Sequence, residues 1–269
     1  MNLDMPSGLA SAIAPYVGES RSFRPPVVRG YSSDVTGVVE GSEGRFFIKG
    51  VRGEGGHRDS LLREAAVNPY VREFSPAVRW EAEEGDWLVL GFDVLDDIRA
   101  ADLASGSADL TDVAAVLNRI SDLPCPDVAH GWQETRWNRF LDNDADRALL
   151  HGDTLLHTDI NAHNVLIAPD HTWVVDWSWP TVGAAFIDPA LLVLQLVSGT
   201  HTPAEAEELA ATCKAWKDAD PRAVDVFVAA TLRMQTKIAQ RHPQETWIKA
   251  MLSATETWAE HRGVRPSGK

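Results

Sequence analysis

One stretch of the chain, residues 149–177, has the sequence LLHGDTLLHTDINAHNVLIAPDHTWVVDW. It contains two His-x-Asp triplets, His151-Gly152-Asp153 and, six residues later, His157-Thr158-Asp159. If such a triplet marks a catalytic loop, only one of the two can fill that role. The residues that follow each triplet separate them.

The spacing to the next polar side chain favours the second triplet. Five residues after Asp159 comes Asn164, whose amide oxygen is a good ligand for a hard cation such as Mg²⁺. Five residues after Asp153 comes Thr158, which is not a comparable ligand. We therefore expect Asp159 to belong to the functional loop and Asp153 to be a surface residue.

A predicted hairpin adds a third polar residue. Residues 165–168 and 173–176 favour two short strands, and Pro169-Asp170-His171-Thr172 favours a turn between them. A hairpin brings the residue before its first strand close to the residue that ends its second strand, here Asn164 and Asp176. The expected constellation is a carboxylate, an amide and a second carboxylate, which suits Mg²⁺.

The pattern His157-x-Asp159, Asn164 and the strand-ending Asp176 resembles the catalytic core of the aminoglycoside phosphotransferase family, which is related to protein kinases. The resemblance implies an α+β fold of the bilobal protein-kinase-like type. It implies that Asp159 is the catalytic aspartate facing the acceptor hydroxyl. It also implies that Asn164 and Asp176 hold Mg²⁺ on the phosphates of ATP or GTP.

The resemblance also implies a phosphate-binding lysine on an early strand and a glutamate on the next helix. Lys49 and Glu64 stand at suitable places. Lys49 is the only lysine before Lys214, in a region with fourteen arginines, which suggests a position that needs a compact point charge. A solvent-exposed lysine at a strand end is the alternative, and Glu81, Glu83 or Glu84 could replace Glu64.

A nucleotide-covering turn is expected before the first strand pair, where Ser32 and Ser33 follow Gly30 and can offer hydroxyl and backbone N–H groups to phosphate. By the resemblance, the base would meet the backbone near residues 89–92, so Leu90 and Phe92 are the expected nucleotide contacts. The side chains do not distinguish ATP from GTP.

Several residues depart from the family pattern. Thr158 and His163 stand where the family often has glycine, which restricts the backbone angles of the loop. Asn161 replaces the lysine common in protein kinases, and Trp177-Ser178 replaces Phe-Gly. Asp188, followed by Pro189, resembles the aspartate that braces the catalytic loop; taken alone, it is a helix N-cap.

Two lobes are expected, a small β-rich lobe over residues 1–91 and a larger, mainly helical lobe over residues 92–269. Four of the later helices begin at or near a proline, which is well tolerated in a first helical turn. The predicted strands are 35–40, 45–49, 77–81, 87–92, 165–168 and 173–176, and the predicted helices are 57–74 (divided at Pro69), 189–197, 203–219, 221–240 and 243–261.

Composition limits the partners. The formal net charge of −14 disfavours nucleic acid and anionic membranes and favours neutral or cationic small molecules. The two cysteines stand far apart in the chain, and no stretch is apolar enough to predict a membrane span. We expect a cytoplasmic monomer or homodimer that acts on a small hydroxyl-bearing acceptor, such as an aminoglycoside or another amino or sugar alcohol, with a role in antibiotic resistance as one option.

Two other functions remain open from the sequence. Six candidate ligands close together in the sequence allow a metal hydrolase, namely His151, Asp153, His157, Asp159, His163 and His171, although none of them forms a ligand pair on a predicted helix. The altered loop also allows a nucleotide-binding regulatory protein with weak or no activity on the same fold.

Overall fold

The computed structural model describes residues 5–25 and 33–264 and divides the chain into two compact units. The first contains residues 1–98 together with the short segment Val175–Trp179, and the second contains Arg99–Val174 and residues 180–269. The predicted boundary between residues 91 and 92 falls inside the first unit. Among the helices of the described ranges, none has the length and apolar character needed to cross a membrane.

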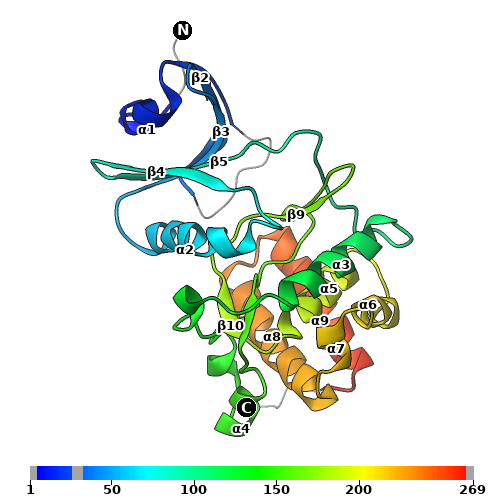
Figure 1. The fold of residues 1–269 in the computed structure, drawn as a ribbon. Coiled ribbons are helices and arrows are strands. Elements are labelled where there is room, and N and C mark those ends of the chain that lie inside the picture. The colour runs from blue at the N-terminus through cyan, green and yellow to red at the C-terminus, as the bar shows by residue number, and fades with distance from the viewer. Residues whose placement is uncertain (1–4, 26–32, 265–269) are drawn as a thin grey trace. The chain divides into compact units, whose positions relative to one another are not determined.

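The first unit is built on a five-stranded antiparallel sheet with two helices (Figure 1). The strand order is β1-β2-β3-β5-β4, so β3 and β5 are interior strands. The bounds are α1 Leu9–Val17, β1 Ser20–Arg24, β2 Val35–Gly41, β3 Arg45–Arg52, α2 Gly56–Val71, β4 Val78–Glu84 and β5 Trp87–Phe92.

Strand β5 is buried along its whole length because helices cover both faces of the sheet. Trp87 and Val89 pack in the core cluster that contains α1. Leu88, Leu90 and Phe92 pack on the other face, with Leu61 of α2. Neighbouring residues of a strand point to opposite faces, so an unbroken apolar run suits a strand covered on both sides.

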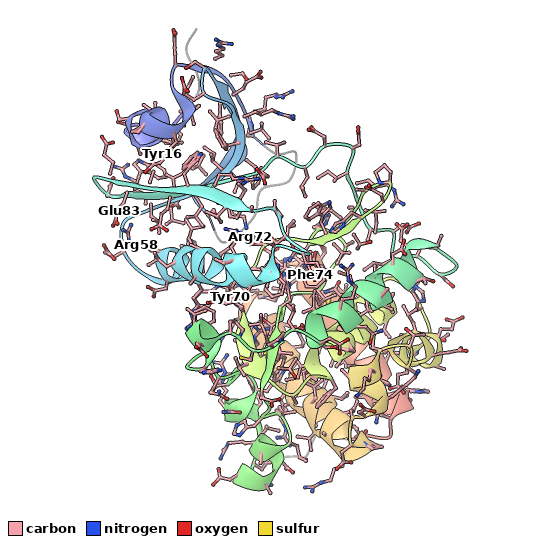
Figure 2. The ribbon with its side chains drawn as sticks, in the orientation of Figure 1. Tyr16, Arg58, Tyr70, Arg72, Phe74 and Glu83 are labelled. Atoms are coloured by element: carbon pink, nitrogen blue, oxygen red, sulfur yellow. The ribbon has the colours of Figure 1, made fainter. Side chains whose placement is uncertain are left out.

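Helix α2 carries Glu64 and runs without interruption through Pro69, which corrects the expected division there. Proline removes one backbone hydrogen bond, but the helix ends two residues later, so only the last turn is affected. The buried side chain of Asn68 ties this end to the sheet by donating to Pro76 O at 2.9 Å and accepting from Val78 N at 2.8 Å. At the other end, Arg58 forms an ion pair with Glu83 of β4 (Figure 2).

The second unit is mainly helical and contains two small antiparallel sheets, β6-β8-β9 and β7-β10. Helix α9 packs against α8 and α5. The predicted helix over 203–219 is two helices, because the chain leaves helical geometry at Cys213. The bounds are β6 Arg99–Ala100, α3 Asp109–Ser121, α4 Asp144–Ala148, β7 Thr154–Leu156, β8 Val165–Ile167, β9 Thr172–Val174, β10 Thr181–Gly183, α5 Ile187–Ser198, α6 Pro203–Ala210, α7 Lys214–Lys217, α8 Pro221–Arg241 and α9 Thr246–His261, with short 3-10 turns at Asp127–Ala129 and Asn138–Phe140.

Candidate active site

The first unit brings three predicted site residues together around Lys49. This lysine lies on the interior strand β3, opposite Thr36 of β2 and Leu90 of β5. Its Nζ donates to both carboxylate oxygens of Glu64, at 2.7 and 2.9 Å, and to Asp176 Oδ1 at 2.8 Å. Lys49 is therefore not a solvent-exposed strand-end residue, and Glu64 is the glutamate that pairs with it.

Burial and charge act in opposite directions on the Lys49 amine. Burial favours the neutral amine, but the carboxylates of Glu64 and Asp176 outweigh it and raise the pKa of Lys49 to about 12. The Glu64 side chain is 3% exposed and the Asp176 side chain 27% exposed. One cation thus stands between two carboxylates, and the cluster carries a net negative charge that a further cation would reduce.

The raised pKa of Lys49 makes a pH prediction. A lysine whose pKa is higher in the folded protein stabilises it fully below the unfolded value of about 10.4, and the contribution disappears as the pH rises through about 12. We expect the difference in melting temperature between the wild type and Lys49→Met/Glu64→Gln, which leaves no buried Glu64 carboxylate to titrate, to stay constant from pH 6 to about pH 10. Thermal unfolding measured by circular dichroism over this range tests it. A difference that shrinks between pH 7 and pH 9 would mean that Lys49 loses its proton there.

Asp176 is held by its own backbone and by a neighbouring hydroxyl. Its φ is 65°, in the left-handed region that aspartate tolerates better than most residues. Its Oδ1 accepts from the Ser178 hydroxyl as well as from Lys49. Ser178 is buried, so this hydroxyl also orients the carboxylate. Ser178, which stands where protein kinases have glycine, thus contributes directly to the position of Asp176.

The second unit brings Asp159 and Asn164 together in the loop between β7 and β8. Asn164 Nδ2 donates to Asp159 Oδ2 at 2.8 Å, and Asn161 Nδ2 donates to Asp159 Oδ1 at 3.1 Å. Asn161 also closes the loop, because its Oδ1 accepts from His163 N at 2.9 Å. Each carboxylate oxygen of Asp159 therefore accepts from a different asparagine, while the residue itself stays exposed.

The buried Asp188 holds this loop through hydrogen bonds from the loop's backbone. Its two carboxylate oxygens accept from His157 N and Thr158 N, each at 2.8 Å. Burial raises the pKa of Asp188, and the bonds from the loop oppose that rise. The bracing role implied by the resemblance agrees with these contacts. The N-cap assignment is wrong, because the N-cap of α5 is Phe186 and Asp188 lies inside the first turn.

Thr158 adopts a backbone conformation that suits glycine. Its φ is 64°, which is strained for a β-branched residue, at a cost of about 1–3 kcal/mol. Arg136 Nη1 donates to Thr158 O at 3.1 Å, and Arg136 Nη2 donates to Thr158 Oγ1 at 2.9 Å. His163, the other position expected to need glycine, is not among the described non-glycine residues with positive φ. Only one of the two departures therefore strains the loop.

The other residues predicted to contact the nucleotide belong to two segments of the chain, one just before β2 and the other β5. Ser32 lies outside the described residues, and Ser33 is half-buried just before β2. The backbone of Leu90 pairs with β3 on one side and β4 on the other. The structure therefore does not support the expectation that this backbone contacts a nucleotide base. Phe92 ends β5, and its ring centroid lies 5.7 Å from Lys49 Nζ. Contacts of Ser33 and of the Leu90 and Phe92 side chains with a nucleotide stay predictions.

The histidines of the stretch do not form a metal centre in the structure. Within residues 5–25 and 33–264, no group of three or more His, Cys, Asp and Glu side chains is arranged to hold a metal ion. His151 and His163 are exposed, and the His171 ring lies against the Trp173 ring in a tilted arrangement, with the ring centroids 4.1 Å apart. His157 is buried, and its Nδ1 accepts from Asp159 N at 3.2 Å.

Comparison with known proteins adds the fold to this geometry. No family model and no curated protein matches the sequence. A microcompartment-associated aminopropanol kinase superimposes with a TM-score of 0.64 at 14% identity, over 97% of this chain and 100% of that chain. The chain has the fold of small-molecule kinases. The kinase-like α+β fold expected from residues 149–177 is thus confirmed.

Two further structures share the kinase-like fold. Choline kinase LicA from Streptococcus pneumoniae matches with a TM-score of 0.63 at 11% identity, over 94% of this chain and 98% of that chain. Spectinomycin phosphotransferase APH(9)-Ia, in complex with ADP and spectinomycin, matches with a TM-score of 0.58 at 11% identity, over 94% of this chain and 93% of that chain. The coverage shows that both units of the chain take part in the likeness.

Several residues that hold the Asp159 loop or Asp176 were not predicted in these roles from the sequence. Arg136 and Glu134 precede the loop by more than twenty residues and have no motif around them. Ser178 was noted only as a replacement for glycine, although a hydroxyl two residues after Asp176 could have been recognised as a partner for its carboxylate. Asn161 stands where protein kinases often have lysine, and its side chain binds Asp159.

Proposed function

We propose that the protein is a phosphotransferase that moves the γ-phosphoryl group of ATP or GTP to a hydroxyl of a small molecule. The observation that carries this proposal is the buried Lys49 held between Glu64 and Asp176. In kinases, a lysine paired with a helical glutamate and placed beside a metal-binding aspartate grips the nucleotide phosphates. The neighbouring structures crystallised with AMP and ADP support nucleotide binding.

Each unit carries an oxygen ligand of the kind that Mg²⁺ prefers. The Asp176 carboxylate and the Asn164 amide oxygen are hard donors, and the amide nitrogen of Asn164 is already engaged with Asp159. A bound Mg²⁺ would neutralise charge on the phosphates. Lys49 stays charged over the physiological pH range and would bind phosphate oxygens as a point charge.

Asp159 is the proposed catalytic base. The acceptor oxygen would attack the γ-phosphorus while the bond from that phosphorus to the bridging oxygen breaks, and the diphosphate leaves. The hydroxyl proton passes to the Asp159 carboxylate. Asn161 and Asn164 hold the two oxygens of this carboxylate, so the base is oriented before the acceptor binds.

We further propose an acceptor that carries an amine as well as a hydroxyl. The net charge of −14 attracts cations, and two of the neighbouring structures are named for choline and aminopropanol, both amino alcohols. An aminoglycoside belongs to the same chemical class, which keeps a role in antibiotic resistance open. The two cysteines are both free, which agrees with a cytoplasmic location.

Thermal shift with nucleotide, followed by a transfer screen, tests the function. We expect millimolar ATP or GTP with Mg²⁺ to stabilise the protein, by about 2.7 kcal/mol when the nucleotide is at 100 times its Kd. We then expect transfer of labelled γ-phosphate to at least one of choline, aminopropanol, spectinomycin or a neutral sugar. The absence of any stabilisation would contradict nucleotide binding. Stabilisation without transfer would support the regulatory protein instead.

A further inference from the structure

The loop that carries Asp159 is held by an arginine from a distant part of the second unit. We propose that Arg136 is a positioning residue: by holding Thr158 in its left-handed conformation, it sets the direction of Asp159. This inference rests on the proposed function, because it concerns the geometry of the proposed base. The carboxylate, the strained residue and the arginine all belong to the second unit.

The peptide group between Thr158 and Asp159 is fixed at both ends. At one end, Arg136 Nη1 donates to Thr158 O at 3.1 Å. At the other end, Asp159 N donates to His157 Nδ1 at 3.2 Å. The rotation of this peptide group determines where the Asp159 side chain points. Asp188 accepts from the preceding N–H groups of His157 and Thr158, whereas Arg136 holds the carbonyl end.

The side chain of Thr158 gives Arg136 a second point of attachment. The hydroxyl accepts from Nη2 at 2.9 Å, so the guanidinium binds one residue through two of its nitrogens. Such a fork restrains orientation as well as distance, which a single ammonium group cannot do. Thr158 is buried, and without these bonds its positive φ would favour relaxation to another conformation.

Arg136 is itself anchored in the second unit. The buried Glu134 accepts from Arg136 N at 2.6 Å and from Thr181 Oγ1 at 2.8 Å, and its Oε2 lies 3.8 Å from Arg136 Nη2. The guanidinium also lies over the ring of Trp137, 5.1 Å from its centroid, and that ring packs against Phe227 of α8. The arginine is therefore a fixed support rather than a mobile surface side chain.

A double-mutant cycle tests the proposal. The variants are Arg136→Met, Thr158→Gly and both together, because glycine adopts positive φ without strain and has no hydroxyl to hold. Arg136→Lys keeps the charge but not the fork. Arg139→Met is the matched control, since Arg139 also lies over an aromatic ring, that of Phe140, 4.9 Å from its centroid.

Two readouts are compared within each background. Residue-resolved hydrogen exchange follows the Asp159 amide, and steady-state kinetics separates kcat from the KM for the nucleotide. In the Thr158 background, we expect Arg136→Met to speed exchange about tenfold or more and to lower kcat about 10- to 100-fold, with KM changed less than about threefold. Arg136→Lys should behave more like Met than like the wild type. In the Thr158→Gly background the strain and the bond to the hydroxyl are absent and only the bond to the backbone carbonyl remains, so removing Arg136 should lower kcat clearly less than in the Thr158 background.

The outcomes separate the proposal from the function on which it rests. Equal losses of kcat on removing Arg136 in both backgrounds, or no loss in either, would overturn the positioning role. A loss of melting temperature with unchanged Asp159 exchange would reduce Arg136 to a structural residue and would also overturn it. If the wild type transfers no phosphate at all, the proposed function fails, and the exchange comparison alone decides whether Arg136 holds the loop through Thr158.

Discussion

Replacement of Asp159 by asparagine is expected to lower phosphate transfer by about 10²- to 10⁴-fold, the usual contribution of a general base. The substitution keeps the size of the side chain but removes the proton acceptor. Nucleotide binding should change little, because Lys49 and Glu64 are in the first unit. The measurement is kcat with the best acceptor from the screen, beside the thermal shift with nucleotide and Mg²⁺.

The sequence supplies a matched control for this experiment. Asp153 ends the other His-x-Asp triplet and is exposed, and Asp153→Asn changes the charge by the same amount. We expect it to leave kcat within about twofold of the wild type, as for most exposed substitutions. Equal losses in both variants would point to a charge effect, and an unchanged kcat in Asp159→Asn would remove Asp159 from the base role.

Replacement of Lys49 by methionine is expected to lower both the free energy of unfolding and the affinity for nucleotide. Removing one partner of a buried ion pair leaves an uncompensated charge and typically costs about 3–5 kcal/mol. Here the carboxylate left behind is that of Glu64, which is buried. Chemical denaturation measures the loss. The nucleotide-induced thermal shift should disappear as well.

A second substitution separates the two effects. Lys49→Met/Glu64→Gln removes the stranded charge, so we expect stability to return in part while the nucleotide-induced shift remains absent. Lys214→Met is the control, because the Lys214–Asp218 ion pair is on the surface and its loss should change stability little. A variant Lys49→Met as stable as the wild type would contradict the buried pairing, and one that still responds to nucleotide would contradict the phosphate role.

The parts of the fold that follow from local pattern were predictable. The strand Trp87–Phe92 matches its prediction residue for residue, because an apolar run next to the Gly85-Asp86 turn determines both its type and its start. The predicted hairpin also forms, with Val165 opposite Val174, although its strands are Val165–Ile167 and Thr172–Val174 instead of 165–168 and 173–176. The break between α6 and α7 was not predictable in this way, since no glycine or proline lies there. Instead Asn118 of α3 accepts from Lys214 N at 2.8 Å, a contact between distant residues.

The candidate site was predictable where a role depends on residue type and spacing. Lys49 pairs with Glu64, the helical glutamate that the resemblance implied, and the structure adds the contact of Lys49 with Asp176 and that of Asn164 with Asp159. The sequence shows that Thr158 departs from the glycine common at this position in the family. It does not show that Arg136 binds Thr158 and so compensates for the strain of its positive φ. The contact with Arg136 joins residues 22 apart across a loop, and only tertiary structure brings that side chain to the strained residue.

The segment Val175–Trp179 belongs to the first unit although it follows residues 99–174, a large part of the second unit, in the chain. Asp176 is 127 residues beyond Lys49. At about 5–20 residues per second of synthesis, the ribosome needs about 6 to 25 s to make the intervening chain. During that time the first unit must fold, or wait, with Lys49 lacking one of its two carboxylates. The order of translation therefore makes Glu64 available to Lys49 before Asp176, the aspartate proposed to bind the metal, is synthesised.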